Sequence, residues 1–154
     1  MMSTVKTLYP LPDEMSPNLL RVRSYWQSLK RAGNEMPFWD DLKPPALLDL
    51  ADSVLLIDAF ANPERFRFNT VGKAFATADG RSLKGKFADE VVLRGPLENL
   101  RSQCSATVEG KVPTFYRHDG SRDAPAFARL LLPMWGDGHV SMLLGALEPA
   151  LAAG

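Results

Sequence analysis

The feature that most constrains this chain is the stretch from Arg65 to Lys86, which reads RFRFNTVGKAFATADGRSLKGK. It opens with apolar side chains at every second position, Phe66 and Phe68, and a polar Arg67 between them. This alternation is typical of a half-buried β-strand, because successive side chains of a strand point to opposite faces of the sheet. The stretch therefore predicts a strand over residues 66–71.

Glycines divide the residues that follow this strand. Gly72 ends it, a short helix is predicted over 73–78, and Gly85 marks a later turn. We predict that Gly72 and Gly85 adopt a left-handed backbone conformation, which favours glycine. Both glycines are then needed for backbone geometry rather than for chemistry.

The remaining segments predict an antiparallel sheet. A strand over 53–60 is turned by Asn62-Pro63 into the strand over 66–71, and a helix runs from Pro96 to Val108, closed by Gly110. Three further strands are predicted, over 113–117, 124–135 and 139–147, and turns at 118–120 and 136–138 join them. Pro133 predicts a bulge or an edge position in the second of these strands, because proline lacks a backbone donor. The pattern predicts an α+β fold with about five strands and helices across one face.

The N-terminal part predicts a lead-in and a flanking helix. Residues 1–15 are expected to form a flexible lead-in, 16–34 an amphipathic helix, 35–149 the main domain and 150–154 a tail. Ser16 is a good capping residue, and Pro17 is suited to the first helical position. The helix is expected to continue to Ala32 and to stop at Gly33.

One face of this helix carries a narrow apolar stripe, formed by Leu19, Val22, Trp26 and Leu29. An exposed stripe of this kind is costly in water, so it must be covered. Two interpretations stay open: the stripe docks on its own domain, or it forms the contact of a homodimer.

Length and composition describe one globular domain. The chain has 154 residues, of which 45% are hydrophobic, enough for a packed core. Lys and Arg number 18, as do Asp and Glu, so no basic surplus indicates nucleic acid or a membrane surface. The single cysteine, Cys104, excludes an intrachain disulfide, and the N-terminus lacks the apolar core of a signal peptide. We expect a cytoplasmic protein.

The residues that carry chemistry are few, and we do not expect an enzyme. His118 and His139 are the only histidines, and no Gly-x-Ser-x-Gly turn, phosphate-binding loop or dinucleotide-binding fingerprint is present. Zinc requires closely spaced ligands, whereas Cys104, His118 and His139 are spread widely along the chain. We therefore expect no catalytic residues and no metal.

The order of these elements resembles the PAS sensory domain, and in particular a family of small bacterial PAS proteins. The residues that carry the resemblance are the helix with Tyr25-Trp26, the segment 36–48, the strand Phe66 to Gly72, the element Gly80 to Gly85, and the run Leu130 to Met134. The chain departs from the family at Asn69 and Lys73, where a basic and a small hydroxyl residue are common. The resemblance covers residues 18–149.

This resemblance implies a single-domain sensory or regulatory module that acts through ligand binding or protein contacts. A small-molecule carrier or an enzyme on the same fold is the alternative. The resemblance also implies a homodimer through the N-terminal helix and a separate signalling protein as partner. The central helix lacks the histidine that usually holds haem, and Cys104 lacks the Asn-Cys-Arg-Phe context of a flavin adduct. Haem and covalent flavin are therefore not expected, and the cofactor stays unknown.

PAS domains bind ligands between the sheet and the helices, so the interior side chains are the candidates for a small apolar pocket. They are Phe68, Phe75, Phe87, Phe115, Leu131 and Met142. A packed core explains the same residues more simply, since protein interiors leave few voids. The sequence does not decide between these interpretations.

Overall fold

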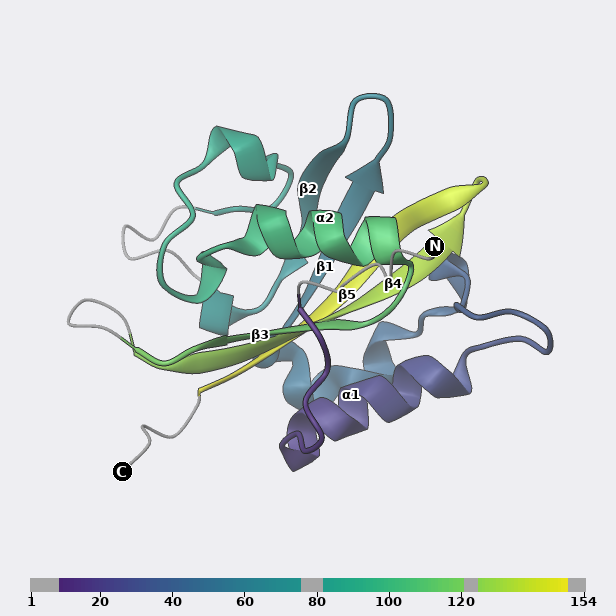
Figure 1. Cartoon of the computed structure of the whole chain (residues 1–154), viewed down its shortest axis with the longest axis horizontal. Helices are drawn as coiled ribbons and strands as arrows, with labels where there is room; N and C mark the ends of the chain where they lie inside the picture. Colours follow the sequence, from purple (N-terminus) through teal and green to yellow (C-terminus); the bar gives the residue numbers. More distant parts are fainter. Residues whose placement is uncertain (1–8, 76–81, 121–124, 150–154) are drawn as a thin grey trace, which may run out of the picture.

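The computed structural model describes residues 9–75, 82–120 and 125–149 of the chain (Figure 1). Its α-helices are α1 (Pro17–Ser28) and α2 (Leu100–Gly110). Its strands are β1 (Val54–Phe60), β2 (Arg65–Val71), β3 (Thr114–His118), β4 (Phe127–Gly136) and β5 (His139–Pro149). Short 3-10 helices fill the connections: η1 (Trp39–Asp41), η2 (Pro44–Ser53), η3 (Lys73–Phe75), η4 (Ala88–Glu90) and η5 (Gly95–Leu97).

The strands form one antiparallel sheet in the order β2-β1-β5-β4-β3. Hairpins join β1 to β2 and β4 to β5, and the first and last strands of the chain pair in the middle, with Ile57 opposite Leu143. The predicted α+β fold with a five-stranded antiparallel sheet is confirmed. None of the described helices combines the length and the apolar character that a membrane span requires.

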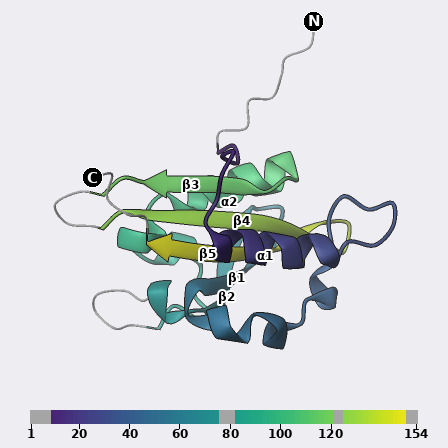
Figure 2. The ribbon, with the colours of Figure 1, turned by 90° about the horizontal axis from the view of Figure 1, so that it is seen from below.

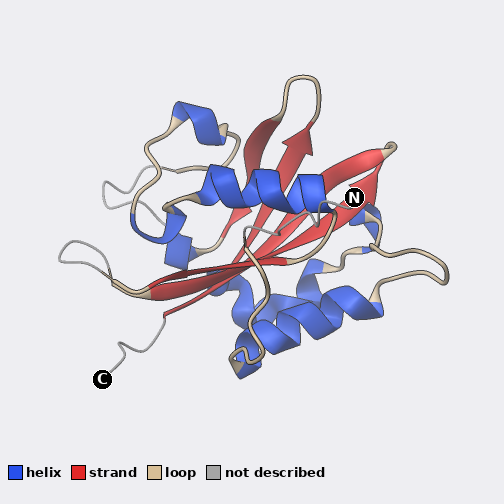
Figure 3. Cartoon of the chain, viewed as in Figure 1, coloured by secondary structure: helices blue, strands red, loops and turns tan. Residues whose placement is uncertain are grey.

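The two α-helices lie on opposite faces of the sheet, as the two views in Figures 1 and 2 show. In Figure 3 the strands form one red layer between helical segments. The predicted helices across one face did not include the N-terminal flanking helix, whose docking was left open; the structure places this helix, α1, on the second face. The reason is in β4 and β5, where long runs of consecutive residues are buried on both sides. A sheet that is apolar on both faces needs a cover on each.

Helix α1 begins as predicted and ends earlier. The hydroxyl of Ser16 accepts a hydrogen bond from the Leu19 amide, and Pro17 occupies the first turn. The helix ends at Ser28 instead of continuing to residue 32, because the amides of Leu29 and Lys30 bond to carbonyls only three residues back. This tighter pattern is common in the last turn of a helix.

The helix predicted from Pro96 is broken in two. The chain forms η5, and Asn99 then takes a left-handed conformation with φ of 63° before α2 begins. At the other end Gly110 lies inside the helix, and Lys111, with φ of 54°, takes the left-handed position predicted for the glycine. The break turns the backbone carbonyls of residues 96 and 98 toward the sheet, where they become part of the site described below.

The two glycines of the β2 region have different roles. Gly85 has φ of 84°, so its predicted left-handed conformation is confirmed. For Gly72 the prediction was wrong: its φ is not positive, and a Cβ there would lie 2.4 Å from the carbonyl oxygen of Asp52. Gly72 therefore permits a close backbone approach. Gly80 and residues 76–78 of the predicted helix lie outside the described residues.

Both outer strands of the sheet are paired along part of their edge. The Phe115 amide of β3 donates to the Tyr9 carbonyl at 3.0 Å, and the Gly85 amide donates to the Phe68 carbonyl of β2 at 2.7 Å. Residues 9–16, which we call the strap, run across β3 from the α2 side to α1 (Figures 1 and 2). Residues 1–8 of the predicted lead-in and 150–154 of the predicted tail lie outside the described residues.

Candidate functional site

The six residues predicted to line an apolar pocket do not share one place. Phe68 and Leu131 are fully buried on the side of the sheet that α2 covers, and Phe75 is fully buried in η3. The others lie elsewhere: Phe115 and Met142 alternate onto the α1 face, and Phe87 is half-buried at the outer edge of β2. Phe68, Phe75, Leu131 and Met142 belong to the packed hydrophobic core.

The predicted dimer stripe is covered by its own sheet. Leu19, Val22 and Trp26 are buried in the single chain, and Leu29 packs partly against the core. The Trp26 indole N–H donates to the Pro133 carbonyl at 2.8 Å. Docking on its own domain, one of the two interpretations, is thus what the structure has. The homodimer stays a prediction, and contacts through this stripe would require α1 to leave the sheet.

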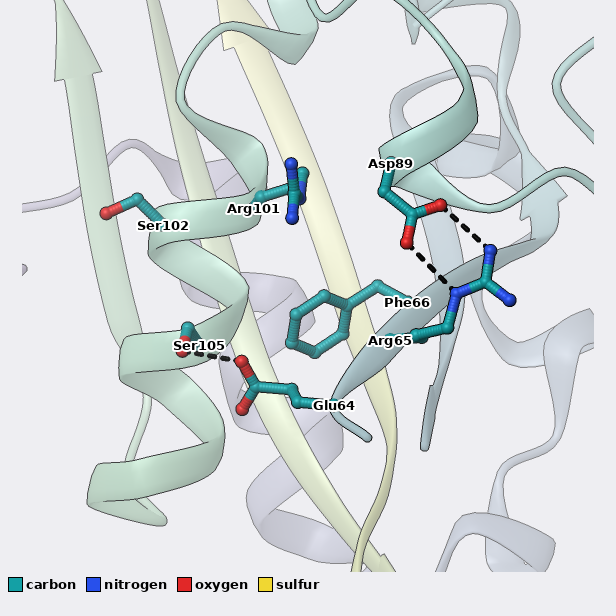
Figure 4. Close-up of a pocket in the computed structure, with 7 residues that line it drawn as sticks. All are labelled: Glu64, Arg65, Phe66, Asp89, Arg101, Ser102 and Ser105. Atoms are coloured by element: carbon teal, nitrogen blue, oxygen red, sulfur yellow. Dashed lines mark hydrogen bonds and ion pairs between the residues drawn. The ribbon is translucent and has the colours of Figure 1, made fainter. Parts of the chain in front are cut away.

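A polar cavity of about 250 Å³ lies between α2, the start of β2 and η4 (Figure 4). We call it the α2 groove. It is lined by Glu64, Arg65, Phe66, Asp89, Arg101, Ser102 and Ser105. Strand, helix and 3-10 turn each contribute side chains, so the groove depends on the tertiary fold and not on one local motif.

One charge pair in the α2 groove is already neutralised. Arg65 binds Asp89 through two parallel hydrogen bonds of 2.9 and 3.0 Å, and its guanidinium lies 3.7 Å from the centroid of the Phe87 ring. The hydrogen bond from Arg65 holds the pKa of the Asp89 carboxyl below its usual range. This fork geometry is the strong form of an arginine–carboxylate contact.

The other two charges of the groove, Glu64 and Arg101, form no ion pair within the described residues, although the positive charge of Arg101 helps to lower the pKa of the nearby Asp89. Glu64 accepts a hydrogen bond of 2.8 Å from the Ser105 hydroxyl, which is uncharged. Arg101 extends beside the cavity (Figure 4) and has no hydrogen-bond or ion-pair partner among the described residues. The α2 groove therefore presents one cation and one carboxylate to a ligand.

A buried polar network lies behind the groove, between α2 and β3-β4. Arg129 is fully buried, and its guanidinium donates to Gln103 Oε1 and to the carbonyls of Pro96 and Glu98, at 2.8 to 2.9 Å. The Gln103 amide in turn donates to the Thr114 hydroxyl at 3.1 Å. Arginine rarely occurs fully buried without a carboxylate partner. Here three oxygens satisfy it and fix the chain at the break before α2.

The charge of Arg129 is kept in spite of its burial. Loss of hydration lowers the pKa of Arg129 to about 10, which leaves the group protonated at neutral pH. Its guanidinium lies 5.0 Å from the ring centroid of Tyr116 and 5.7 Å from that of Phe127. Aromatic faces attract cations, so the two rings replace part of the lost hydration.

His118 forms a second polar contact at the end of β3. Its Nε2 lies 2.6 Å from a carboxylate oxygen of Glu98, its Nδ1 accepts from the Gly120 amide, and its ring stacks on Phe127. An accepting Nδ1 places the proton on Nε2, which donates to Glu98. The sequence predicts a turn over 118–120; the structure places His118 at the end of β3 and holds it half-buried between these partners.

Cys104 is buried on α2 as expected of a small apolar residue. Burial raises the pKa of its thiol to about 12. A protonated thiol is a poor nucleophile and a poor metal ligand. Within the described ranges no cluster of three or more His, Cys, Asp or Glu residues is placed to hold a metal ion.

Tyr9 connects the groove helix to the strap. Its hydroxyl lies 2.7 Å from the hydroxyl of Ser102, which also lines the α2 groove, and it accepts from the Asn99 side chain at 2.8 Å. The Tyr9 ring packs edge-on against Tyr116. A groove residue is thus one hydrogen bond away from the segment that leads into α1.

Sequence reasoning missed the residues that shape this region, namely Arg129, Gln103, Glu98, Glu64 and Arg101. For Arg129 a signal was present, because it alternates with apolar Phe127 and Leu131 on one face of a strand. A charge at such a position indicates an internal partner. For Glu64 and Arg101 no local pattern exists, since only the fold brings them to one groove.

Comparison with known proteins adds no identification: no family model matches this chain, and neither does any curated protein or solved structure.

Proposed function

We propose that this chain is a single-domain sensory or regulatory module of PAS type, which binds a small ligand in the α2 groove. The sheet order and the run of short helical turns before α2 are compatible with a PAS-like fold and support this proposal. The observation that carries it is the groove itself, where three elements gather charged and hydroxyl side chains around one concave surface.

The strap is the proposed route from ligand to output. Ser102 lines the groove and bonds to Tyr9, and the backbone of Tyr9 is paired with Phe115 at the edge of β3. A ligand that draws Ser102 into the groove would weaken this attachment and alter the position of α1. We propose that α1 then changes its contacts with a second copy or with a separate signalling protein in the cytoplasm.

The test has two steps, ligand capture and amide exchange. Mass spectrometry of the purified protein identifies small molecules that copurify, and each is added back at increasing concentration in a thermal unfolding assay. Hydrogen exchange of the Phe115 amide, which is bonded to Tyr9, then reports the strap. We expect a ligand that raises the melting temperature and accelerates exchange at Phe115.

A matched variant separates the module from the alternative, a carrier or an enzyme on the same fold. Tyr9→Phe removes the hydroxyl that contacts Ser102 and leaves the backbone bond to Phe115. In a sensory module this variant keeps ligand binding and loses the exchange response. Binding with no exchange response in the unaltered protein would indicate a carrier, and the absence of any copurifying or stabilising small molecule would overturn ligand sensing.

A further inference from the structure

We infer that the ligand of the α2 groove is a small zwitterion carrying an ammonium and a carboxylate, of the class of the free amino acids. This inference rests on the proposed function, since it names the ligand of the same groove. It follows from the two charges of the groove that form no ion pair within the described parts of the chain, the guanidinium of Arg101 and the carboxylate of Glu64.

Asp89 is near enough to Arg101 for the arginine's charge to lower the pKa of its carboxyl, but its side-chain hydrogen bonds go to Arg65. Arg65 and Asp89 are held by each other in a bidentate pair, so neither is available to a ligand without breaking two hydrogen bonds. Glu64 contacts only an uncharged hydroxyl, that of Ser105, within the part of the chain that the structure describes. A ligand that complements the groove therefore carries one anionic and one cationic group.

The two charges are spaced along α2. Arg101 and Ser105, which holds Glu64, lie four residues apart on the same side of the helix, a rise of about 6 Å. The ring of Phe66 lies beside α2, below Arg101 and next to Glu64 in Figure 4. A ligand whose opposite charges are joined by a short carbon framework can contact both ends while the framework lies against this ring.

The position of Arg101 favours a ligand role. It lies in the first turn of α2, where the helix dipole opposes a positive charge. A carboxylate bound to Arg101 would gain from both the guanidinium and the helix terminus. The arginine therefore contributes little to the stability of the helix and is placed well for an anion.

The size of the groove limits the ligand. Its volume of about 250 Å³ lies below the roughly 300–1,000 Å³ of pockets for drug-sized ligands. Nucleotides and other large cofactors are thus too big to be enclosed. A single amino acid matches both the volume and the charge pattern.

The experiment uses the full chain and the twenty free amino acids, each titrated singly by calorimetry. For those that bind, the N-acetyl derivative, which lacks the ammonium, and the amide derivative, which lacks the carboxylate, are titrated in parallel. Arg101→Gln and Glu64→Gln are compared with Arg94→Gln and Glu109→Gln, exposed charges that do not line the groove. Circular dichroism verifies that each variant is folded.

We expect at least one amino acid to bind, and each groove variant to weaken its binding at least tenfold, with the two controls within twofold. Equal binding of the N-acetyl derivative would show an anion site and overturn the inference, and equal binding of the amide would do so for a cation site. If no amino acid binds while another small molecule copurifies and needs Arg101, the zwitterion is wrong and the proposed function stands. If no small molecule binds at all, both fail.

Discussion

The two faces of the sheet are covered by helices of similar length but different chemistry. On one face α1 buries Leu19, Val22 and Trp26 against β4 and β5, with a single side-chain hydrogen bond from the Trp26 indole. On the other face Gln103 of α2 lies over Arg129 and Thr114 of the sheet, and all three are fully buried and bonded to one another or to backbone. The first face resembles an ordinary core, whereas the second combines an apolar core with a buried polar network.

The two faces therefore differ in how strictly their side-chain geometry is fixed. Apolar packing tolerates changes of shape that conserve volume, whereas a buried network demands that every donor and acceptor be satisfied. The face that needs fixed geometry is the one that borders the α2 groove and the break before α2. We therefore expect substitutions on the α1 face to lower stability in proportion to the apolar volume removed. Substitutions on the α2 face should lower it according to the hydrogen bonds that are lost.

The largest effect is expected at the centre of the network. Arg129→Met is similar in length but leaves Gln103 Oε1 and the carbonyls of Pro96 and Glu98 without their donor. Each buried acceptor left without a donor costs about 1 to 3 kcal/mol, so the three together should cost several kcal/mol, which urea unfolding would measure. An unchanged urea midpoint would show that the network is not needed for stability, and the contrast between the faces would disappear.

On the α1 face, the loss of stability on substitution should depend only on how deeply the side chain is buried. Leu19→Ala removes a side chain that is 2% exposed, and Leu20→Ala removes its neighbour, which is 42% exposed. We expect Leu19→Ala to lower the free energy of unfolding by about 3 kcal/mol and Leu20→Ala by less than about 0.5 kcal/mol. If Leu20→Ala costs as much, or if the two effects change with protein concentration, a second copy covers α1.

The same two faces explain how far the sequence could predict this structure. The strands were predicted closely because alternation and turn residues are local signals, as for β1 and β2. The docking of α1 was left undecided, because the stripe with Leu19 and Trp26 would be buried equally well by its own sheet or by a second copy. The network and the groove were missed because they join residues from distant segments, such as Gln103 with Arg129 and Glu64 with Ser105.

A pH experiment sharpens the description of the α2 face. Burial raises the pKa of Cys104 to about 12, against 9.0 for the accessible thiol. Above pH 9 the unfolded chain releases this proton while the folded chain keeps it, so rising pH favours unfolding. Relative to Cys104→Ala, the protein should lose about 1.4 kcal/mol of stability per pH unit between pH 9 and 11. A difference between the two proteins that stays constant over this range would mean that the thiol is accessible to water.

The smallest effect concerns the strap that joins the two faces. Tyr9→Phe removes two hydrogen bonds of an exposed hydroxyl, to Ser102 and Asn99, and should cost only about 0.5 to 1 kcal/mol. Tyr25→Phe is the matched control on the α1 side, since its hydroxyl bonds to the backbone of Lys43.

The two tyrosine variants should differ in local opening even if their costs in stability are equal. Tyr9→Phe should accelerate amide exchange at Phe115, whose N–H is bonded to the Tyr9 carbonyl, and Tyr25→Phe should leave it unchanged. Local opening depends on the contacts that hold one segment, and the Tyr9 hydroxyl is the side-chain anchor of the strap on α2. If both variants leave the Phe115 amide protected, the strap is held by its apolar contacts, made by Leu11 and Met15. In that case Tyr9 does not transmit changes in the groove to α1.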